Sequence, residues 1–247
     1  MNPEQYIRYY NLEDGYWWFK GMRNIFLGQI ERIFNGRKDL KILDIGCGTG
    51  RTMSEMRKFG YCVGMDMEPA ALESCKNRNM YNLVCAQADK LPFESDSFDL
   101  VTLFSVIEHV EDDSMLVSEV YRVCKSGGLA MFSTSAFNFL WSGNDIVSRH
   151  KRRYSKKQML RLINKHFDIQ KITYTNFFLF PIVCLGVIFS NIKRRQSGHA
   201  RDGFYKVPGF LNRLLALIPK LESIIIIKHS LPLGVSLLCV AKKAGKD

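Results

Sequence analysis

The sequence has few of the features that mark a secreted, metal-binding or membrane-spanning protein. Its seven cysteines form no C-x-x-C pair and most lie within apolar runs, which indicates reduced core thiols rather than disulfides or a metal site. The first residues contain no basic stretch followed by an apolar one, so we expect no signal peptide. No apolar run reaches the ~18–20 residues that a bilayer-crossing helix needs. A cytoplasmic location is the expectation.

Acidic residues are also scarce. The chain has 24 Asp and Glu residues against 35 Lys and Arg residues, a formal net charge of +11, which favours an anionic partner. Nucleic acid, a membrane surface and an acidic substrate remain open at this point. The 247 residues are enough to bury a full core and suit one α/β domain with additions.

A glycine-rich turn between an apolar strand and a helix is the most informative stretch. Residues 41–45 predict a short buried strand, and a helix is expected over residues 51–59. Between them Gly46, Gly48 and Gly50 occupy alternate positions. Glycine permits unusual backbone angles and lets a ligand lie against bare peptide, while the helix start offers unpaired N–H groups. The stretch therefore predicts a nucleotide-type cradle.

The glycine spacing argues against a dinucleotide. The dinucleotide fingerprint is G-x-G-x-x-G, and Arg51 stands where its third glycine should fall, which disfavours a dehydrogenase. A G-x-G-x-G loop preceded by Leu43-Asp44 resembles the S-adenosylmethionine (SAM) loop of class I methyltransferases. SAM has no pyrophosphate, so the later glycine is not needed. The resemblance implies SAM as the cofactor.

Two acidic residues follow the next predicted strands. Asp66 ends a strand over residues 62–66, where its carboxylate can accept hydrogen bonds from both ribose hydroxyls. Asp89 follows a strand over residues 83–86, and the resemblance implies that it accepts from the adenine amino group. Either acid alone would be an ordinary loop carboxylate, but both fall at the expected strand ends.

The remaining pattern predicts the rest of the sheet. Strands are expected over residues 97–105, 129–134, 167–175 and 234–242. A helix is expected over residues 113–123, stopped by Gly127 and Gly128. A further helix begins with a capping box at Ser155 and runs to His166. The fold class is thus α/β, a doubly wound, seven-stranded, mostly parallel sheet of Rossmann-like methyltransferase type, with the last two strands of the chain antiparallel as the resemblance implies. The resemblance covers about residues 15–175 and 232–242 and includes the Glu108-His109 strand exit. It assigns cofactor binding to Asp44, Gly46, Cys47, Gly48, Gly50, Asp66, Met67, Ala88, Asp89, Lys90, Ser105 and His109.

Residues 1–40 precede the first strand and contain a dense aromatic group followed by Arg23. A helix is expected over about residues 21–34. Trp17 and Trp18 fit either packing against the core or a lid over cofactor and substrate, and a similar "WWF" element precedes the SAM loop in many methyltransferases. The segment is assigned as an N-terminal helical lid.

Residues 177–231 form an apolar insertion that divides the core into residues 41–176 and 232–247. Its first apolar run is too short to span a bilayer and is followed by the basic residues 193–195. The second apolar run, residues 210–227, is partly helical and contains Pro219. A pair of helices in monotopic contact with an anionic membrane is one interpretation, which would place the protein peripherally on the inner face. A substrate cap and a dimer interface are the others.

Methyl transfer to a hydroxyl needs correct placement and a base, and placement alone supplies ~7–11 kcal/mol. His109 and His150 both follow strand ends, where open α/β sheets bind ligands, and both are candidate bases. Each has a structural alternative, a cofactor-side hydrogen bond for His109 and a solvated basic run for His150. Tyr154 is a weaker candidate. Residues 151–153 are basic and are candidates for holding a phosphate or carboxylate of the acceptor.

Three functions follow, in order of preference. The first is SAM-dependent O-methylation of a small hydrophobic or lipid-linked acceptor at a membrane surface. The second is nucleic-acid methylation, which is disfavoured because residues 105–108 read Ser-Val-Ile-Glu where base N-methylating relatives carry [DNS]-P-P-Y. The third is a non-catalytic SAM-binding or membrane-interaction protein. The acceptor and the oligomeric state do not follow from the sequence.

Overall fold

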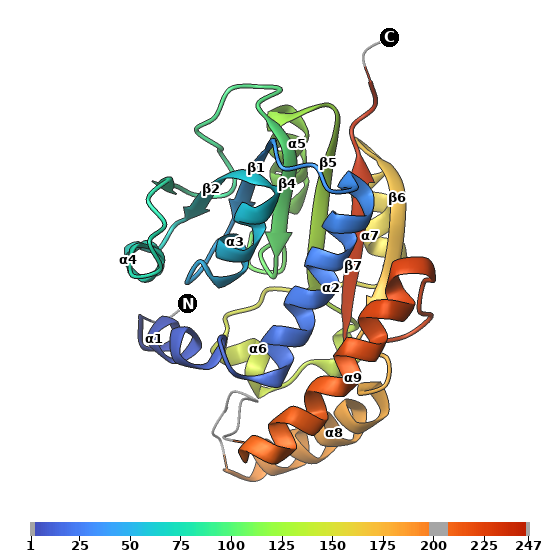
Figure 1. Ribbon diagram of the computed structural model, residues 1–247. Coiled ribbons are helices and arrows are strands. Elements are labelled where there is room, and N and C mark those ends of the chain that lie inside the picture. Colours follow the sequence, from blue (N-terminus) through green and yellow to red (C-terminus); the bar gives the residue numbers. More distant parts are fainter. Residues whose placement is uncertain (1–2, 198–206, 246–247) are drawn as a thin grey trace.

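The computed structural model describes residues 3–197 and 207–245 and shows one twisted sheet with helices on both faces (Figure 1). The strands are β1 (Leu40–Ile45), β2 (Gly60–Asp66), β3 (Leu83–Cys85), β4 (Phe98–Phe104), β5 (Cys124–Ser135), β6 (Asp168–Thr175) and β7 (Ser236–Lys242). Their order across the sheet is β3-β2-β1-β4-β5-β7-β6. The first five strands pair in parallel, and β7 is antiparallel to both β5 and β6. The predicted doubly wound, seven-stranded, mostly parallel sheet is confirmed.

Helices pack on both faces of the sheet, and each face has a separate apolar core. The helices are α1 (Pro3–Leu12), α2 (Trp17–Phe34), α3 (Arg51–Met56), α4 (Pro69–Lys76), α5 (Asp113–Val123), α6 (Gly143–Val147), α7 (Lys156–Ile163), α8 (Phe180–Ser197) and α9 (Gly209–Lys228). Of these, α1, α6 and α8 lie beyond the carboxyl ends of the parallel strands (Figure 1). The apolar stripe of α5, with Leu116 and Val120, joins α7 on one face of the sheet. Ile25 of α2, Met53 of α3 and Ile226 of α9 belong to the core on the other face.

α5 has its predicted bounds, but Gly127 and Gly128 have a different role from the predicted one. The helix ends at Val123 and β5 begins at once with Cys124, so Gly127 and Gly128 do not stop the helix. They lie in an irregular stretch of β5, where the pairing with β4 shifts register. Gly127 has φ +76°, and a Cβ at Gly128 would lie 2.9 Å from the Lys125 carbonyl oxygen. These glycines therefore serve a bulge in a strand, a role that glycine also favours.

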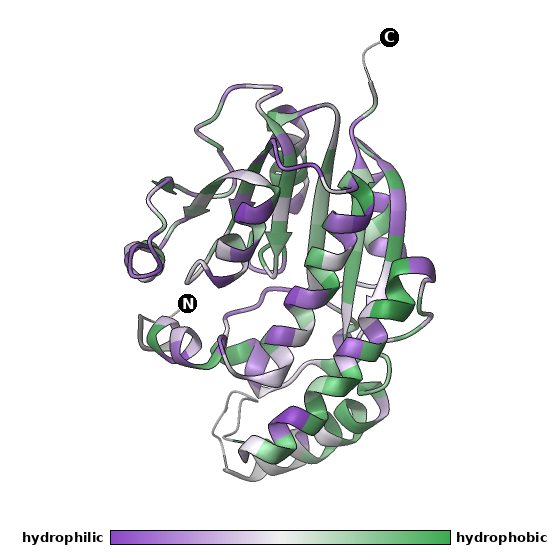
Figure 2. Ribbon diagram, viewed as in Figure 1, coloured by the Kyte–Doolittle hydropathy of each residue, from purple (hydrophilic) through white to green (hydrophobic). Residues whose placement is uncertain are grey.

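The apolar insertion contains the two predicted helices, α8 and α9. α9 lies along α2 (Figure 1), so closely that a Cβ at Gly21 would lie 2.4 Å from Cβ of Pro219. Buried Glu222 of α9 accepts hydrogen bonds from the backbone N–H groups of Asn176 and Phe177, just before α8. Hydrophobic residues recur along both helices (Figure 2). Within the described ranges, neither these nor any other helix combines the length and apolarity that crossing a membrane requires.

Candidate functional site

A cavity of about 970 Å³ opens at the carboxyl ends of the parallel strands. Its walls come from the glycine turn after β1, the ends of β2 and β4, the aromatic segment around α2, the loop around α6, and the two inserted helices. Open α/β sheets bind ligands at this edge. The predicted residues on the lining are Asp44, Gly46, Cys47, Gly48, Asp66, Met67, Ala88, Asp89, Ser105, His109 and His150.

The glycine turn has the conformation that its sequence requires. Gly46, Gly48 and Gly50 have φ values of +66°, +55° and +79°, in the left-handed region that favours glycine. A Cβ at Gly46 would lie 2.4 Å from Cγ2 of Val106, so a side chain there is excluded by contact as well as by backbone angle. The Gly46 and Cys47 N–H groups donate to the Met65 carbonyl, which fixes the turn against β2.

Asp66 connects the end of β2 to this turn. Its Oδ2 accepts from the Gly48 N–H at 3.0 Å, and its Oδ1 accepts from the Glu68 N–H at 3.0 Å. A carboxylate has about four acceptor positions, so both oxygens retain capacity for a ligand hydroxyl. Burial raises the pKa of Asp66, and the two backbone hydrogen bonds oppose that shift. Asp89 is exposed and lines the same cavity.

Asp44 lies deeper at the base of the cavity. Its Oδ1 accepts from the Thr102 hydroxyl at 2.6 Å, and the residue is only 3% exposed. Burial raises the pKa of Asp44 to about 7, while the hydrogen bond from Thr102 opposes the shift. The site therefore contains a carboxyl group whose charge changes near neutral pH.

This pKa makes a prediction about stability. The folded pKa of about 7 lies above the ordinary value of 3.8, so the native state binds more protons than the unfolded state between those pH values. The contribution of Asp44 to stability is thus present at low pH and is lost as pH rises through 7. Relative to Asp44→Asn, we expect the wild-type unfolding free energy to fall by up to about 4 kcal/mol between pH 4 and pH 7. Urea unfolding of both proteins across this range measures the difference, and parallel curves would contradict the assignment.

The aromatic segment closes the cavity over the glycine turn. Its lining side chains are Tyr6, Tyr9, Tyr16, Trp17, Trp18, Phe19 and Phe26. Glu13, between α1 and α2, accepts from the Thr49 hydroxyl in the turn and from Arg78 Nη2 at 2.9 Å. The Arg78 guanidinium also lies 4.2 Å from the centre of the Tyr10 ring. The segment is therefore tied to the turn by charge and aromatic contacts together.

Arg23 is a site residue that sequence reasoning did not assign. It is only 4% exposed, and its side chain lines the cavity. Its Nε donates to Glu55 at 3.0 Å, and its Nη1 donates to the Glu13 carbonyl at 2.7 Å. A buried guanidinium on a ligand cavity suits a carboxylate. The sequence signal that could have assigned Arg23 to the site is its position one helical turn after the aromatic group.

His150 is held by a buried network after β5. Its Nδ1 lies 2.8 Å from Asp145 Oδ1, and its side chain is 7% exposed. Arg153 donates to the same carboxylate through Nε at 2.7 Å and Nη2 at 2.9 Å. Burial alone would raise the pKa of Asp145, but hydrogen bonds from His150 and Arg153 hold it below its usual range. Because Asp145 is an anion, the proton of neutral His150 lies on Nδ1, and Nε2 is the nitrogen that accepts.

His109 differs from its neighbour. Its ring centre lies 4.7 Å from that of His150, in an edge-to-face arrangement. Burial, and then the proximity of His150, lower the pKa of His109 to about 4. His109 is therefore neutral at physiological pH and is a weak base. Between the two predicted candidates, the geometry favours His150 as the base.

Three other predicted residues do not reach the cavity. Gly50 begins α3 and packs against Cys75, and Lys90 is exposed elsewhere. Tyr154 is 4% exposed, and its hydroxyl donates to Asp113 at 2.7 Å. Burial, followed by this hydrogen bond, raises the pKa of Tyr154. We therefore withdraw Tyr154 as an acid–base candidate.

The basic residues 151–153 are also not free to hold an acceptor. Lys151 pairs with Glu111, Arg152 Nη1 lies 3.0 Å from Asp113, and Arg153 is engaged by Asp145. The prediction of an acceptor-binding basic run does not fit these pairings. Among the residues that the structure describes, no group of three or more His, Cys, Asp or Glu side chains is arranged to hold a metal ion.

Comparison with known proteins shows which family the chain resembles. Residues 43–132 match the family model of a methyltransferase domain. Over 141 residues the chain is 31% identical to the malonyl-[acyl-carrier protein] O-methyltransferase of Buchnera aphidicola, covering 56% of each protein. Over 108 residues it is 31% identical to the ubiquinone biosynthesis O-methyltransferase of Coxiella burnetii, covering 41% of this chain and 46% of that protein. The chain spans about half the length of the curated relatives it matches.

The fold agrees with that of solved structures. The crystal structure of a SAM-dependent methyltransferase from Methanosarcina mazei superposes with a TM-score of 0.56 at 15% identity, covering 87% of this chain and 97% of the other. Residues 43–132 thus form a methyltransferase domain, and together with the named relatives they support a class I SAM-dependent methyltransferase with SAM as the cofactor. The residues present fit that cofactor, because a side-chain-free turn at Gly46 and Gly48 lies beside two acids, Asp66 and Asp89, on one cavity.

Proposed function

We propose that the protein is an O-methyltransferase that acts on the hydroxyl group of a small hydrophobic or lipid-linked acceptor at a membrane surface. The observation that carries the proposal is the His150–Asp145 pair on the wall of the SAM cavity. SAM supplies a methyl group on a sulfonium, which is already a good leaving group, so an alcohol acceptor needs only placement and a base. The two relatives named above are both O-methyltransferases, which supports oxygen as the atom that receives the methyl group.

The chain's own residues have separable roles in this proposal. Gly46 and Gly48 provide bare backbone against which SAM lies. Asp66 accepts from the ribose hydroxyl groups of SAM, and Asp89 accepts from its adenine amino group. Arg23 pairs with the carboxylate of the methionine part of SAM. His150 Nε2 accepts the acceptor's hydroxyl proton, while Asp145 keeps the ring oriented and stabilises its charged form. The aromatic segment 1–40 acts as a lid that excludes water.

The acceptor class follows from the wall opposite the glycine turn. The α8 side chains there are Ile182, Val183 and Val187, with Leu179 before the helix and Leu215 from α9. Among the side chains that the structure describes, no charged one from either inserted helix lines the cavity. An apolar wall of this kind favours an apolar acceptor. The inserted helices therefore act as a substrate cap on their inner side.

The outer side of the same helices supports contact with a membrane. The exposed apolar side chains outside the cavity lining are Leu185, Ile188 and Phe189 on α8 and Phe210, Leu214, Leu217, Leu221 and Ile224 on α9. Those of α9 recur every three or four residues and form one stripe. Exposed charged side chains described on these helices, such as Arg213 and Lys220, are basic, and the acidic Glu222 is buried. The side chains of residues 193–195, predicted to contact headgroups, lie outside the described ones.

A charge placed on each apolar face tests the membrane contact. We expect wild-type protein to co-sediment with anionic liposomes at low salt and to lose that binding as Phe189→Asp/Leu221→Asp, because each carboxylate is repelled by anionic headgroups and removes an apolar anchor. Tyr81→Asp, at an exposed position on the loop before β3, is the matched control and should bind as wild type does. If wild-type protein stays in the supernatant, the membrane part of the proposal fails. A dimer that dissociates only in the double variant assigns the faces to self-association instead.

The acceptor is identified by mass spectrometry. A lipid and metabolite extract incubated with the protein and deuterium-labelled SAM should yield a labelled methyl ether, whereas a labelled methyl ester would replace the hydroxyl acceptor by a carboxylate. A labelled N-methyl product would replace O-methylation. SAM binding by calorimetry without any labelled product would support the non-catalytic alternative.

A further inference from the structure

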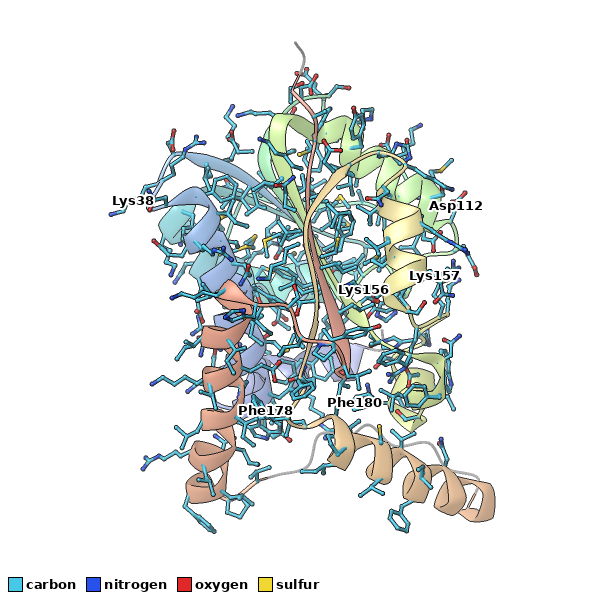
Figure 3. All side chains as sticks on the ribbon, turned by 90° about the vertical axis from the view of Figure 1, so that its right-hand side faces the viewer. Lys38, Asp112, Lys156, Lys157, Phe178 and Phe180 are labelled. Carbon is cyan, nitrogen blue, oxygen red and sulfur yellow. The ribbon has the colours of Figure 1, made fainter. Side chains whose placement is uncertain are left out.

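A second cavity, of about 620 Å³, lies on the edge of the sheet away from the SAM site. Its lining residues are Gln29, Arg32, Ile33, Lys156, Ile169, Gln170, Lys171, Ile172, Lys228, Ser230 and Val240. They come from α2, the start of α7, the edge strand β6, the end of α9 and strand β7. Figure 3 views this edge, with α9 on the left and α7 on the right. It shares no lining residue with the SAM cavity.

The charge of this cavity is of one sign. Its lining includes four cations, Arg32, Lys156, Lys171 and Lys228, and no acidic residue. Lys171 is half-buried and the other three are exposed, and none of the four forms an ion pair with a described carboxylate. Solvated surface lysines are common and would not by themselves indicate a ligand. Their convergence on one hollow, without a counter-charge, is the unusual feature.

Two of these cations are held close together. Arg32 Nη1 and Lys171 Nζ both donate to the carbonyl oxygen of Ile227, the latter at 3.3 Å. Burial, and then the charge of Arg32, lower the pKa of Lys171, which shows that its ammonium is incompletely solvated and repelled by its neighbour. Two like charges that share one acceptor are a favourable position for an anion.

A buried amide supplies an independent sign of a ligand. Gln29 is 1% exposed and lines the cavity, and its Nε2 is buried without a hydrogen-bond partner. Leaving a buried donor unpaired is costly, and each such group in a native structure calls for an explanation. A ligand acceptor atom in the cavity would satisfy it. Gln29 lies one turn before Arg32 on α2, so both can address the same ligand.

We propose that this cavity binds a phosphate group, which Arg32, Lys171 and Lys228 neutralise and the Gln29 amide contacts as a neutral donor. Phosphate suits the site because it carries more than one negative charge and several acceptor oxygens, matching several cations and an amide. The group belongs either to a free phosphate compound or to a lipid headgroup. This proposal does not depend on methyl transfer.

Phosphate binding is tested with the full chain and inorganic phosphate at constant ionic strength. We expect the melting temperature to rise by about 3–6 °C when phosphate reaches ten times its dissociation constant, because the ligand binds only the folded state. Lys171→Met removes one charge with little change in volume and should abolish the rise. Lys157→Met, one residue beyond Lys156 on α7 and outside the cavity, is the matched control and should keep it.

Gln29→Met provides a second variant that does not remove charge. Without phosphate it should be at least as stable as wild type, because it eliminates an unpaired buried donor, and with phosphate its melting temperature should rise less. A variant that is merely damaged would be less stable under both conditions. Thus the comparison separates ligand contact from a structural role.

Vesicles distinguish the two sources of the phosphate group. Phosphatidate vesicles should bind wild type more tightly than phosphatidylserine vesicles of equal charge if the ligand is a lipid headgroup, and Lys171→Met should remove that preference. A melting-temperature rise with inorganic phosphate and no preference between the vesicles assigns a free phosphate compound. If Lys171→Met and Lys157→Met behave alike in every assay, the proposal is overturned.

Discussion

Replacing His150 by alanine is expected to lower the methyl-transfer rate by about 10²–10⁴-fold, the usual contribution of a positioned general base. The dissociation constant of SAM should remain near that of the wild type, because the residues proposed to hold the cofactor are untouched. The ring is well placed for this role, since Asp145 Oδ1 accepts from Nδ1 at 2.8 Å, which leaves Nε2 as the accepting nitrogen, and His150 lines the cavity. The measurement is the rate of label transfer from SAM into the extracted product.

Two further variants make this result specific. His229→Ala removes an exposed histidine after α9 and should leave the rate unchanged. Asp145→Asn should lower the rate as well, because an amide no longer fixes the His150 tautomer, although it also disturbs Arg153. Full activity in His150→Ala would eliminate this residue as the base and return the role to His109 or to water.

Replacing Asp66 by alanine should weaken SAM binding by a factor on the order of 10²–10⁴. Two hydrogen bonds to a carboxylate, at about 1.5–3 kcal/mol each, give that range. The variant also removes the acceptor for the Gly48 N–H, which is 3.0 Å from Asp66 Oδ2, so the turn loses part of its support. Calorimetric titration with SAM measures the loss.

The control for Asp66 is Glu73→Ala, an exposed acid on α4 that pairs with Lys76 and lies outside the cavity. It should bind SAM as wild type does. Circular dichroism shows whether Asp66→Ala is folded. Unchanged affinity in a folded Asp66→Ala protein would mean that the adenosyl group binds elsewhere, and the site built around Gly46–Gly50 would have to be abandoned.

The sheet and the glycine turn were predictable because their signals are local and periodic. Residues 41–45 and 97–105 are nearly continuous apolar runs, which is typical of strands buried on both faces. The capping box at Ser155 located the start of α7. The bounds of α5 were right, but the role of Gly127 and Gly128 was wrong, because a pair of glycines serves a helix stop and a β-bulge equally well and only the register of β5 against β4 decides between them.

The hydrogen-bonded network around His150 was not predictable from the sequence, although His150 itself was a candidate base. Asp145, His150 and Arg153 lie five and three residues apart in an irregular loop, where no period indicates which side chains meet. Sequence reasoning consequently treated Arg153 as a ligand-binding cation, whereas the fold directs it to Asp145. Tyr154 was overrated for the same reason, because its neighbour Asp113 comes from a distant helix. The role of Arg23 in the cavity could not be predicted, because a lone arginine after an aromatic group has no distinctive spacing.

The position of β7 has a consequence for how the chain assembles. Among the described strands, β6 forms a ladder with β7 alone, beside one isolated bridge from Tyr174 to Leu231, and β7 separates β6 from β5. During synthesis, β6 therefore cannot join the sheet until residues 236–242 leave the ribosome and form β7 between β5 and β6. By then α8 and α9 have already been synthesised. Pairings of such long sequence separation form late. The inserted apolar helices are accordingly exposed in the nascent chain before the sheet can close, so shielding by a chaperone or early contact with lipid would favour a high yield of folded protein.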